Sequence, residues 1–209
     1  MGFVIEEASG PEAVDIYLCR HGRTAMNAAG RLRGRLDPDL DLVGVAEARD
    51  LGRLLGALAP ARVVASPLRR AVATAAPVAD AAGVTVEIDD RLADRAYGRF
   101  DGAVKAEVVA EFGSLDAAPG VEPATAVFER AAAALADLVR PDGPTPVVVV
   151  SHDAVIRQLL NHLTPGPGQV DHVPPRTGCW SLLRHDGEGW HLLVANSKDD
   201  PQEVALARA

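Results

Sequence analysis

Residues 14–24 read VDIYLCRHGRT and place a histidine directly after an apolar segment. The apolar part, Val14–Cys19, alternates in the way that predicts a β-strand, and His21 follows it almost at once. Further along the chain, Val147–Val150 is a run of four β-branched residues, which is typical of a strand buried on both faces. This run also leads into a histidine, His152. The two predicted strands therefore end in the same manner.

Strand-like and helix-like segments alternate along the rest of the chain, which indicates a sheet with crossover helices. Helices are predicted over residues 43–58, 67–82, 104–112, 127–138 and 154–163. Asp41 would cap the first of them, and Gly83 would end the second. Further strands are predicted over residues 62–65 and 85–88, with a terminal hairpin over 180–183 and 190–194. The fold class that follows is α/β: a three-layer α/β/α sandwich around a mostly parallel central sheet with crossover helices.

The length of 209 residues fits a single domain covering residues 1–209. Within it the pattern weakens over residues 89–123, which predicts a loop-rich lid with one short helix. The composition, 48% hydrophobic and 24% charged, is that of a soluble globular protein. No apolar run approaches the length of a bilayer span, so we expect no membrane partner.

Charge and cysteine content indicate which partners and which location to expect. The net charge of -8 argues against a nucleic-acid partner, and any phosphate-bearing ligand must then be held by local cations. The N-terminal residues lack the basic start and apolar stretch of a secretory signal, so we expect a cytoplasmic protein. Cys19 and Cys179 are expected to be buried, reduced thiols. No pattern fixes the oligomeric state, and a homodimer is left open.

The two histidines at strand ends are the first candidates for a site. In an open α/β sheet, ligands bind at the carboxyl ends of the strands. His21 and His152 would face one crevice if their strands were neighbours, and Arg20 would lie beside them. A lone histidine would more often be a hydrogen-bonded loop residue, but two at the same kind of position favour a site. Gly22 adds to this, because glycine lets a backbone approach a ligand closely.

Five blocks of the sequence, in order, resemble the histidine phosphatase superfamily, also called phosphoglycerate mutase-like. The first is the family's Arg-His-Gly-x-Thr signature, which Arg20 to Thr24 match and Asn27 follows. The other four are Gly30–Gly34 with Asp37 and Gly44, Ser66–Ala71 with Thr74 and Ala75, Arg91-Leu92 with Gly98–Gly102, and Ser151-His152. The resemblance covers most of the chain and implies the phosphoglycerate mutase-like fold.

The resemblance also implies roles for individual residues. His21 would be the nucleophile, because a neutral imidazole can attack phosphorus and form a phosphohistidine. Arg20 and Arg70 would clamp the phosphoryl oxygens, since guanidinium groups match that geometry. His152 would donate to the same oxygens in the transition state. The substrate-binding set is completed by Asn27, Thr24 and Arg33, although a solvated surface position is an equal alternative for Arg33.

The proton donor is less clearly specified. Mutase-type members usually carry a glutamate where Asp94 stands here, and a shorter carboxylate reaches less far. Asp153 directly follows His152, as in the His-Asp pair of the acid-phosphatase branch, where the aspartate protonates the leaving group. We favour Asp94, because the length and block order resemble the mutase-like branch, and we keep Asp153 as the alternative proton donor. An alternative role for Asp153 is the N-cap of the following helix.

The expected function is a phosphomonoesterase that hydrolyses a small phosphorylated metabolite through a phosphohistidine on His21, without a metal or other cofactor. Mutase-type phosphoryl transfer is one alternative, but the chain lacks the length for the insertions of cofactor-dependent mutases. A phosphate-ester-binding module without catalysis is another. A metal-dependent phosphohydrolase using His152 and Asp153 would need further ligands, and no cluster with ligand spacing is visible. The segment Gly120–Pro123 keeps the family's glutamate, Glu122, but not the serine after it.

Overall fold

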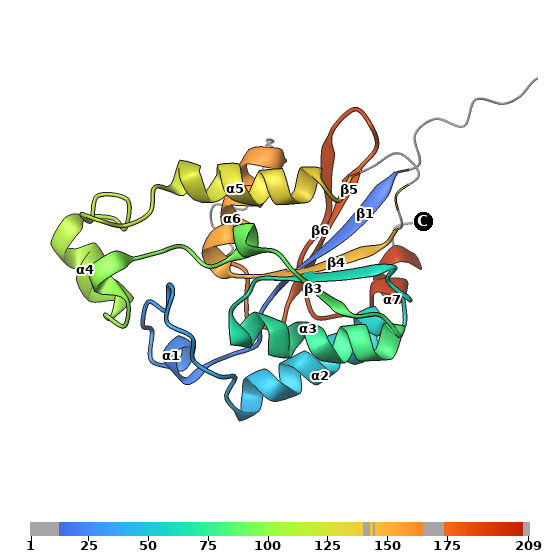
Figure 1. Ribbon diagram of the computed structural model, residues 1–209, viewed down its shortest axis with the longest axis horizontal. Coiled ribbons are helices and arrows are strands. Elements are labelled where there is room, and N and C mark those ends of the chain that lie inside the picture. The colour runs from blue at the N-terminus through green and yellow to red at the C-terminus, as the bar shows by residue number, and fades with distance from the viewer. Residues whose placement is uncertain (1–12, 140–142, 144, 165–173, 207–209) are drawn as a thin grey trace, which may run out of the picture.

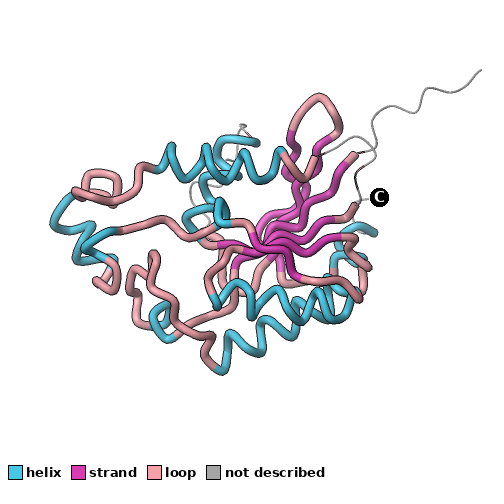
Figure 2. The backbone as a smooth tube through the Cα atoms, in the orientation of Figure 1, coloured by secondary structure: helices cyan, strands magenta, loops and turns pink. Residues whose placement is uncertain are grey.

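The computed structural model describes residues 13–139, 143, 145–164 and 174–206. Its strands are β1 (Val14–Arg20), β2 (Arg62–Ala65), β3 (Val86–Ile88), β4 (Val147–Ser151), β5 (Trp180–His185) and β6 (Trp190–Ser197). They form one sheet in the order β3-β2-β4-β1-β5-β6, gathered at the centre of the molecule (Figure 2). The pairs β3-β2, β2-β4 and β4-β1 are parallel, while β5 and β6 add an antiparallel hairpin. The mostly parallel sheet and the terminal hairpin are thus confirmed.

Helices cover both faces of this sheet, as the three-layer prediction requires (Figure 1). One layer holds α2 (Leu42–Gly56) and α3 (Arg69–Ala82), and the other holds α5 (Ala124–Ala136) and α6 (Asp153–Leu163). Alternate residues of the central strands face the two helix layers. Ile16 and Leu18 of β1 pack with α5 and α6, whereas Tyr17 and Cys19 pack with α2 and α3.

The run Val147–Val150 forms the middle of β4 and is fully buried. Val147 and Val149 face one layer, and Val148 and Val150 face the other. Burying a valine side chain contributes about 1.5–3 kcal/mol, so this strand is a main support of the core. The β-branched run thus has the position that the sequence predicts.

The ends of the long helices follow local chemistry. Asp41 is the N-cap of α2, and its carboxylate accepts a hydrogen bond from the Gly44 N–H at 2.9 Å. Gly83 ends α3 with φ of 70°, a left-handed conformation that glycine adopts without strain. The start of α3 lies later than predicted, at Arg69, because Leu68 is still extended.

The region over residues 89–123 contains the one short helix that the sequence predicts, α4 (Lys105–Phe112), within mostly irregular chain. The two 3-10 helices η1 (Asp90–Leu92) and η2 (Gly98–Phe100) were not predicted. The side chains of this region form a small apolar cluster of Tyr97, Phe100, Val108 and Ala118 with Leu32. Together with α1 (Ala25–Ala28), α4 lies on the side of the sheet to which the carboxyl end of β1 points (Figure 1).

The cysteines and the length of the helices can be compared with the expectations from composition. Both cysteines, Cys19 and Cys179, are buried and free. Among the described residues, no helix has the length and apolar character to cross a membrane. Residues 1–12, which carry the expectation about a secretory signal, lie outside the described part of the chain. The short helix α7 (Pro201–Leu206) follows β6.

Candidate active site

The register of the sheet brings the two histidines together. β1 and β4 are parallel neighbours, and Arg20 pairs with Ser151 at their carboxyl ends. The next residue of each strand segment is a histidine, His21 and His152. Their rings lie 5.0 Å apart between centroids, tilted by 57°. The two imidazoles are therefore adjacent, as the strand-end pattern predicts, although both rings are fully buried.

His21 has a defined tautomer. Its Nδ1 lies 2.6 Å from the carbonyl oxygen of Gly22. Because a carbonyl oxygen only accepts, Nδ1 carries the proton and Nε2 keeps its lone pair. This Nε2 is buried and has no hydrogen-bond partner within the part of the chain that the structure describes. The ring therefore presents a free lone pair, as a nucleophile must.

The backbone around His21 is held from two sides. The His21 N–H donates to the carbonyl of Ser151 at 3.0 Å. The Gly22 N–H donates at 2.9 Å to the hydroxyl of Thr74, which itself donates to the Arg70 carbonyl at 2.7 Å. A Cβ on Gly22 would lie 2.4 Å from the carbonyl oxygen of Gly44, so only glycine fits at this turn.

Electrostatics keep the imidazole of His21 neutral. The residue is fully buried, and burial lowers its pKa well below the ordinary value of a histidine. The guanidinium groups of Arg70 and Arg20 lower this pKa further, because each repels a second positive charge. At neutral pH the ring is thus unprotonated at Nε2, the form that can attack phosphorus.

His152 is held in place by a serine that directly follows the neighbouring strand β2. The Nε2 atom of His152 lies 2.7 Å from the hydroxyl oxygen of Ser66. The Nδ1 atom of the same ring lies 3.8 Å from Oδ2 of Asp94 and has no hydrogen-bond partner among the residues described. Burial, followed by the charges of His21 and Arg70, lowers the pKa of His152 well below its usual range. The contact with Asp94 is therefore not an ion pair at neutral pH.

Arg70 is fully buried at the start of α3. Its Nη1 donates to the carbonyl of Leu36 at 2.8 Å, and its Nη2 donates to the carbonyl of Gly34 at 3.1 Å. Nη2 also donates to the carboxylate of Asp94 at 3.0 Å. These bonds fix the orientation of the guanidinium beside the histidine pair.

Five buried nitrogen atoms near the histidines have no hydrogen-bond partner among the described residues. They are Nε2 of His21, Nδ1 of His152 and the Nε atoms of Arg20, Arg33 and Arg70. All three arginines lower the pKa of both histidines by their charge, which places them close to the pair. Buried polar atoms are nearly always hydrogen-bonded in folded proteins. The unpaired donors among these five therefore mark where a ligand with acceptor oxygens binds, and the lone pair of His21 Nε2 lies beside them. A phosphoryl group has the charge and the oxygens for this site.

Asp94 lies between η1 and η2 and is only 1% exposed. Its Oδ1 accepts from the Arg95 N–H at 2.9 Å, and its Oδ2 accepts from Arg70. Burial raises the pKa of this carboxyl, although Arg70 and Arg33 act in the opposite direction. The carboxyl therefore keeps its proton to a higher pH than an ordinary aspartate, as a general acid requires.

Asp153 differs from Asp94 in its surroundings. Its Oδ2 accepts from Nη2 of Arg157 at 2.6 Å. Burial acts to raise the pKa of Asp153, but Arg20 and Arg157 outweigh it, and the net result is a lowered pKa. The predicted N-cap role of Asp153 is wrong: His152 is the extended N-cap residue of α6, and Asp153 is the first helical residue, paired with Arg157 one turn on.

A cavity of about 410 Å³ borders this centre. Arg20, Arg33 and Asp153 line the cavity on the side of the histidines. The two histidines themselves are fully buried and are not among the lining residues. The other charged lining groups of the cavity are all cationic, namely Arg23, Arg31, Lys105, Arg157 and Arg176. A chain with a net charge of -8 thus concentrates seven cations and a single carboxylate around one cavity within its described residues.

The two remaining predicted contacts differ in position. Asn27 lines the cavity, and its Oδ1 accepts from the N–H and the hydroxyl of Thr24 at 3.0 and 2.8 Å. Thr24 is fully buried and is not among the lining residues. Its hydroxyl also accepts from the Asn27 N–H, so the two side chains form a capping box at the start of α1. Thr24 thus holds Asn27 beside the cavity.

The sequence analysis missed the cations that surround the far part of the cavity. Arg31, Lys105 and Arg176 come from three separate segments. Arg31 lies within the block Gly30–Gly34, but no role was predicted for it, and Lys105 and Arg176 belong to no recognised block. An isolated bridge between Arg31 and Val104 brings α4 over the end of α1. The only available signal was the excess of arginine near residues 31–35, which does not reveal which side chains face inward.

The described residues contain no cluster of three or more His, Cys, Asp or Glu side chains that could hold a metal ion. The geometry itself supplies a buried imidazole with a free lone pair, a cluster of cations with unpaired donors and a carboxyl with a raised pKa. Together with the α/β sheet, these are the features expected of proteins that transfer phosphoryl groups through a histidine.

Comparison with known proteins agrees with that class. The model of the histidine phosphatase superfamily (branch 1) matches residues 16–198. Glucosyl-3-phosphoglycerate phosphatase of Mycolicibacterium vanbaalenii is 32% identical over 214 residues, covering 92% of this chain and 89% of the relative. A probable phosphoglycerate mutase of Erwinia tasmaniensis is 28% identical over 211 residues, covering 92% of this chain and 97% of its own.

Solved structures give the same result. Mycobacterial glucosyl-3-phosphoglycerate phosphatase in complex with VO3 is similar with a TM-score of 0.78 at 29% identity, over 88% of this chain and 99% of that one. Phosphoglycerate mutase from Bacillus anthracis shares the fold, with a TM-score of 0.80 at 20% identity, over 94% and 97% of the two chains. The chain belongs to the histidine phosphatase superfamily. It is accordingly a phosphoric monoester hydrolase with a phosphoglycerate mutase-like fold.

Proposed function

We propose that the protein hydrolyses its substrate through a phosphohistidine formed on Nε2 of His21. The observation that carries this proposal is the group of unpaired buried nitrogens, with the lone pair of His21 Nε2 among them. Nε2 attacks phosphorus, and the bond between phosphorus and the leaving oxygen breaks as the N–P bond forms. Arg20, Arg70 and His152 hold the phosphoryl oxygens, where negative charge gathers in the transition state.

Asp94 is the proton donor in this proposal. It gives its proton to the leaving alcohol in the first step and, as a carboxylate, takes a proton from the water that attacks phosphohistidine in the second. Its raised pKa and its contact with His152 support this role, whereas the lowered pKa of Asp153 keeps that carboxyl ionised to lower pH and makes it the poorer candidate for proton donor. The Nδ1–H of His21 keeps its hydrogen bond to Gly22 throughout and stabilises the phosphorylated ring.

The proposed substrate is a phosphorylated hydroxy acid of the phosphoglycerate type. The names of the similar proteins refer to phosphoglycerate and to its glucosyl derivative, both of which carry a carboxylate beside the phosphate. The cavity supports this choice, because cations such as Arg31, Lys105 and Arg176 line it beyond those nearest the phosphoryl site. A second negative charge on the substrate would neutralise part of this cationic lining.

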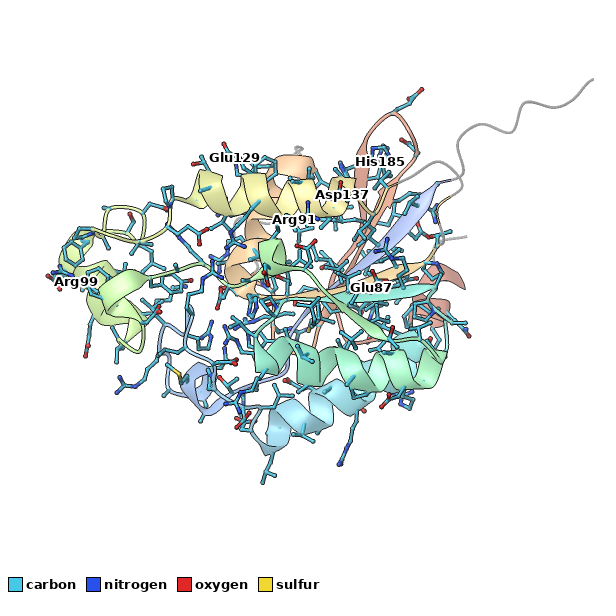
Figure 3. The ribbon with its side chains drawn as sticks, viewed as in Figure 1. Glu87, Arg91, Arg99, Glu129, Asp137 and His185 are labelled. Atoms are coloured by element: carbon cyan, nitrogen blue, oxygen red, sulfur yellow. The ribbon has the colours of Figure 1, made fainter. Side chains whose placement is uncertain are left out.

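A substrate comparison tests both parts of the proposal. Phosphate release would be measured with 3-phosphoglycerate, with glycerol 3-phosphate and with 4-nitrophenyl phosphate. We expect kcat/KM to favour 3-phosphoglycerate over glycerol 3-phosphate by about tenfold or more, equivalent to ~1.4 kcal/mol. Lys105→Gln should reduce that preference. Arg99→Gln is the matched control, because Arg99 is exposed at the outer edge of the region around α4 (Figure 3).

Two outcomes would contradict this assignment. Equal kcat/KM for 3-phosphoglycerate and glycerol 3-phosphate would show that the enzyme does not recognise the carboxylate of the substrate. Full turnover by His21→Ala would show that the reaction does not pass through a phosphohistidine on His21. Transfer of the phosphoryl group to a second hydroxyl of the substrate, without release of phosphate, would identify the mutase alternative.

We also propose a cytoplasmic location. The two cysteines support it, because both are free in a chain with a large buried core. Fractionation of cells that express the tagged protein would test it, and recovery outside the cytoplasm would contradict it.

A further inference from the structure

Arg130 of α5 lies against the segment that carries Asp94. Its Nη1 donates to the carbonyls of Arg91 and Ala93 at 2.6 and 2.7 Å, and its Nη2 donates to the Asp94 carbonyl at 3.3 Å. The other bonds go to the Glu122 carboxylate, at 2.8 Å from Nε and 3.2 Å from Nη2. One guanidinium therefore holds three carbonyls of a segment with little regular structure.

Glu122 extends the same contact to the other side of Asp94. Its Oε2 accepts from the Ala96 N–H at 2.9 Å, and its own N–H donates to the Ala96 carbonyl at 2.8 Å. The carbonyl of Glu122 accepts from Nε of Arg95 at 2.6 Å. Arg130 and Glu122 together, here called the Arg130–Glu122 clamp, thus fix the chain from Arg91 to Ala96.

The clamp fixes the backbone of Asp94, which the hydrogen bonds of the Asp94 carboxylate do not fix. The carboxylate is held by Arg70 and by the Arg95 N–H. The backbone position is set by the clamp and by Ser151, whose hydroxyl donates to the Leu92 carbonyl at 2.8 Å. An aspartate has one methylene less than a glutamate, so its reach toward a leaving oxygen depends directly on where the backbone lies.

An arginine suits this place for a physical reason. Its planar guanidinium offers five N–H donors in a fixed arrangement, and here they meet carbonyls and a carboxylate from several directions. The side chains of Arg130 and Glu122 are 19% and 17% exposed, so their bonds are largely shielded from water. A lysine has three N–H donors on one nitrogen, fewer than the five hydrogen bonds that Arg130 donates here.

We propose that Arg130 is a positioning residue for the proton donor: through the Arg130–Glu122 clamp it sets the place of Asp94 relative to the leaving oxygen. This inference rests on the proposed role of Asp94 as the acid. It requires that loss of Arg130 weakens protonation of the leaving group and spares the attack by His21. An exclusively structural role would instead reduce the rate with every substrate alike.

The test compares substrates that differ in their need for an acid. For Arg130→Met we expect kcat/KM with glycerol 3-phosphate, an alkyl ester with a poor leaving group, to fall about 10- to 100-fold, a part of the contribution that acid catalysis usually makes. With 2,4-dinitrophenyl phosphate, whose leaving group needs no proton, kcat/KM should change less than about threefold, because this ratio reports the first phosphoryl transfer and not the later hydrolysis of phosphohistidine. Glu122→Gln keeps the size of the side chain and provides a second, milder variant.

A matched control removes an arginine from a similar pair elsewhere. Arg62 binds Glu87 through two hydrogen bonds of 2.9 and 2.6 Å at the amino end of β2, away from the histidines. Glu87 is labelled on β3 in Figure 3. Arg62→Met should leave kcat/KM with both substrates unchanged. Thermal unfolding of each variant separates loss of fold from loss of positioning.

The combination with Asp94→Asn decides the question. If Arg130 acts through Asp94, Arg130→Met should add little to the loss that Asp94→Asn already causes with glycerol 3-phosphate. Full additivity of the two losses, or an equal fall with both substrates in Arg130→Met, would overturn the inference about Arg130. A lack of leaving-group dependence in Asp94→Asn itself would instead overturn the proposed role of Asp94. The two failures are therefore distinguishable.

Discussion

Replacement of Asp94 by Asn removes a buried carboxyl proton while keeping the size of the side chain. The amide oxygen can still accept from one of the two donors that hold the carboxylate now, Arg70 and the Arg95 N–H, while the amide nitrogen faces the other. The change therefore removes the acidic proton together with one of these two hydrogen bonds. This makes Asp94→Asn the sharpest perturbation for the proton-donor assignment.

The expected magnitude depends on the leaving group. General acid catalysis contributes about 10²- to 10⁴-fold, or about 2.7–5.5 kcal/mol of barrier, so kcat/KM with glycerol 3-phosphate should fall by that amount. With 2,4-dinitrophenyl phosphate the loss in kcat/KM should be under about threefold, because a nitrophenolate leaves without a proton and kcat/KM reports only the first phosphoryl transfer. Asp153→Asn should lose less than about tenfold with either ester, since the lowered pKa of Asp153 leaves it little proton to give.

The pH profile gives the same test a second readout. A general acid works only while protonated, and burial raises the pKa of Asp94 above that of an ordinary aspartate. The wild-type rate with glycerol 3-phosphate should therefore be highest below this raised pKa and fall as pH rises through it, whereas Asp94→Asn should lack that limb. A leaving-group-dependent loss in Asp153→Asn, with Asp94→Asn unaffected, would refute the reasoning.

Two further predictions concern the support of the histidine pair. Gly22→Ala should cost about 1–3 kcal/mol or more in unfolding free energy, because its methyl carbon would lie 2.4 Å from the Gly44 carbonyl, and should also lower kcat. Gly189→Ala, which meets open space, is the control, and equal unfolding curves for both variants would contradict the prediction. Burial lowers the folded pKa of His21 and His152, so stability should be full above pH ~6.5 and fall on acidification by about 1.4 kcal/mol per pH unit for each histidine. Replacing either with Gln should flatten that slope in urea titrations, and an unchanged slope would count against buried neutral imidazoles.

The sequence could predict the centre of the site because that centre lies at strand ends. A run such as Val147–Val150 indicates a buried strand by itself, and a parallel sheet brings the carboxyl ends of neighbouring strands together. The positions of His21 and His152 follow from these two rules. The layers and the terminal hairpin could be predicted from periodicity in the same way.

The surrounding residues could not be predicted, because their roles depend on contacts between distant segments. Arg130 lies on α5 and acts on carbonyls 36 to 39 positions earlier, a pairing that no local pattern encodes. Lys105 reaches the cavity only because α4 lies over α1. The choice between Asp94 and Asp153 likewise needed their burial and neighbouring charges, which a sequence motif does not carry.

Phosphoryl transfer through Nε2 of His21 is tested most directly by rapid quench with a substrate labelled in its phosphoryl group. We expect an acid-labile, base-stable label on the chain within the first turnover, absent in His21→Ala. Phosphorus NMR of the trapped protein should place it on Nε2, because Nδ1 carries the proton bonded to Gly22. Label that persists in His21→Ala, or that lies on Nδ1, would contradict the mechanism.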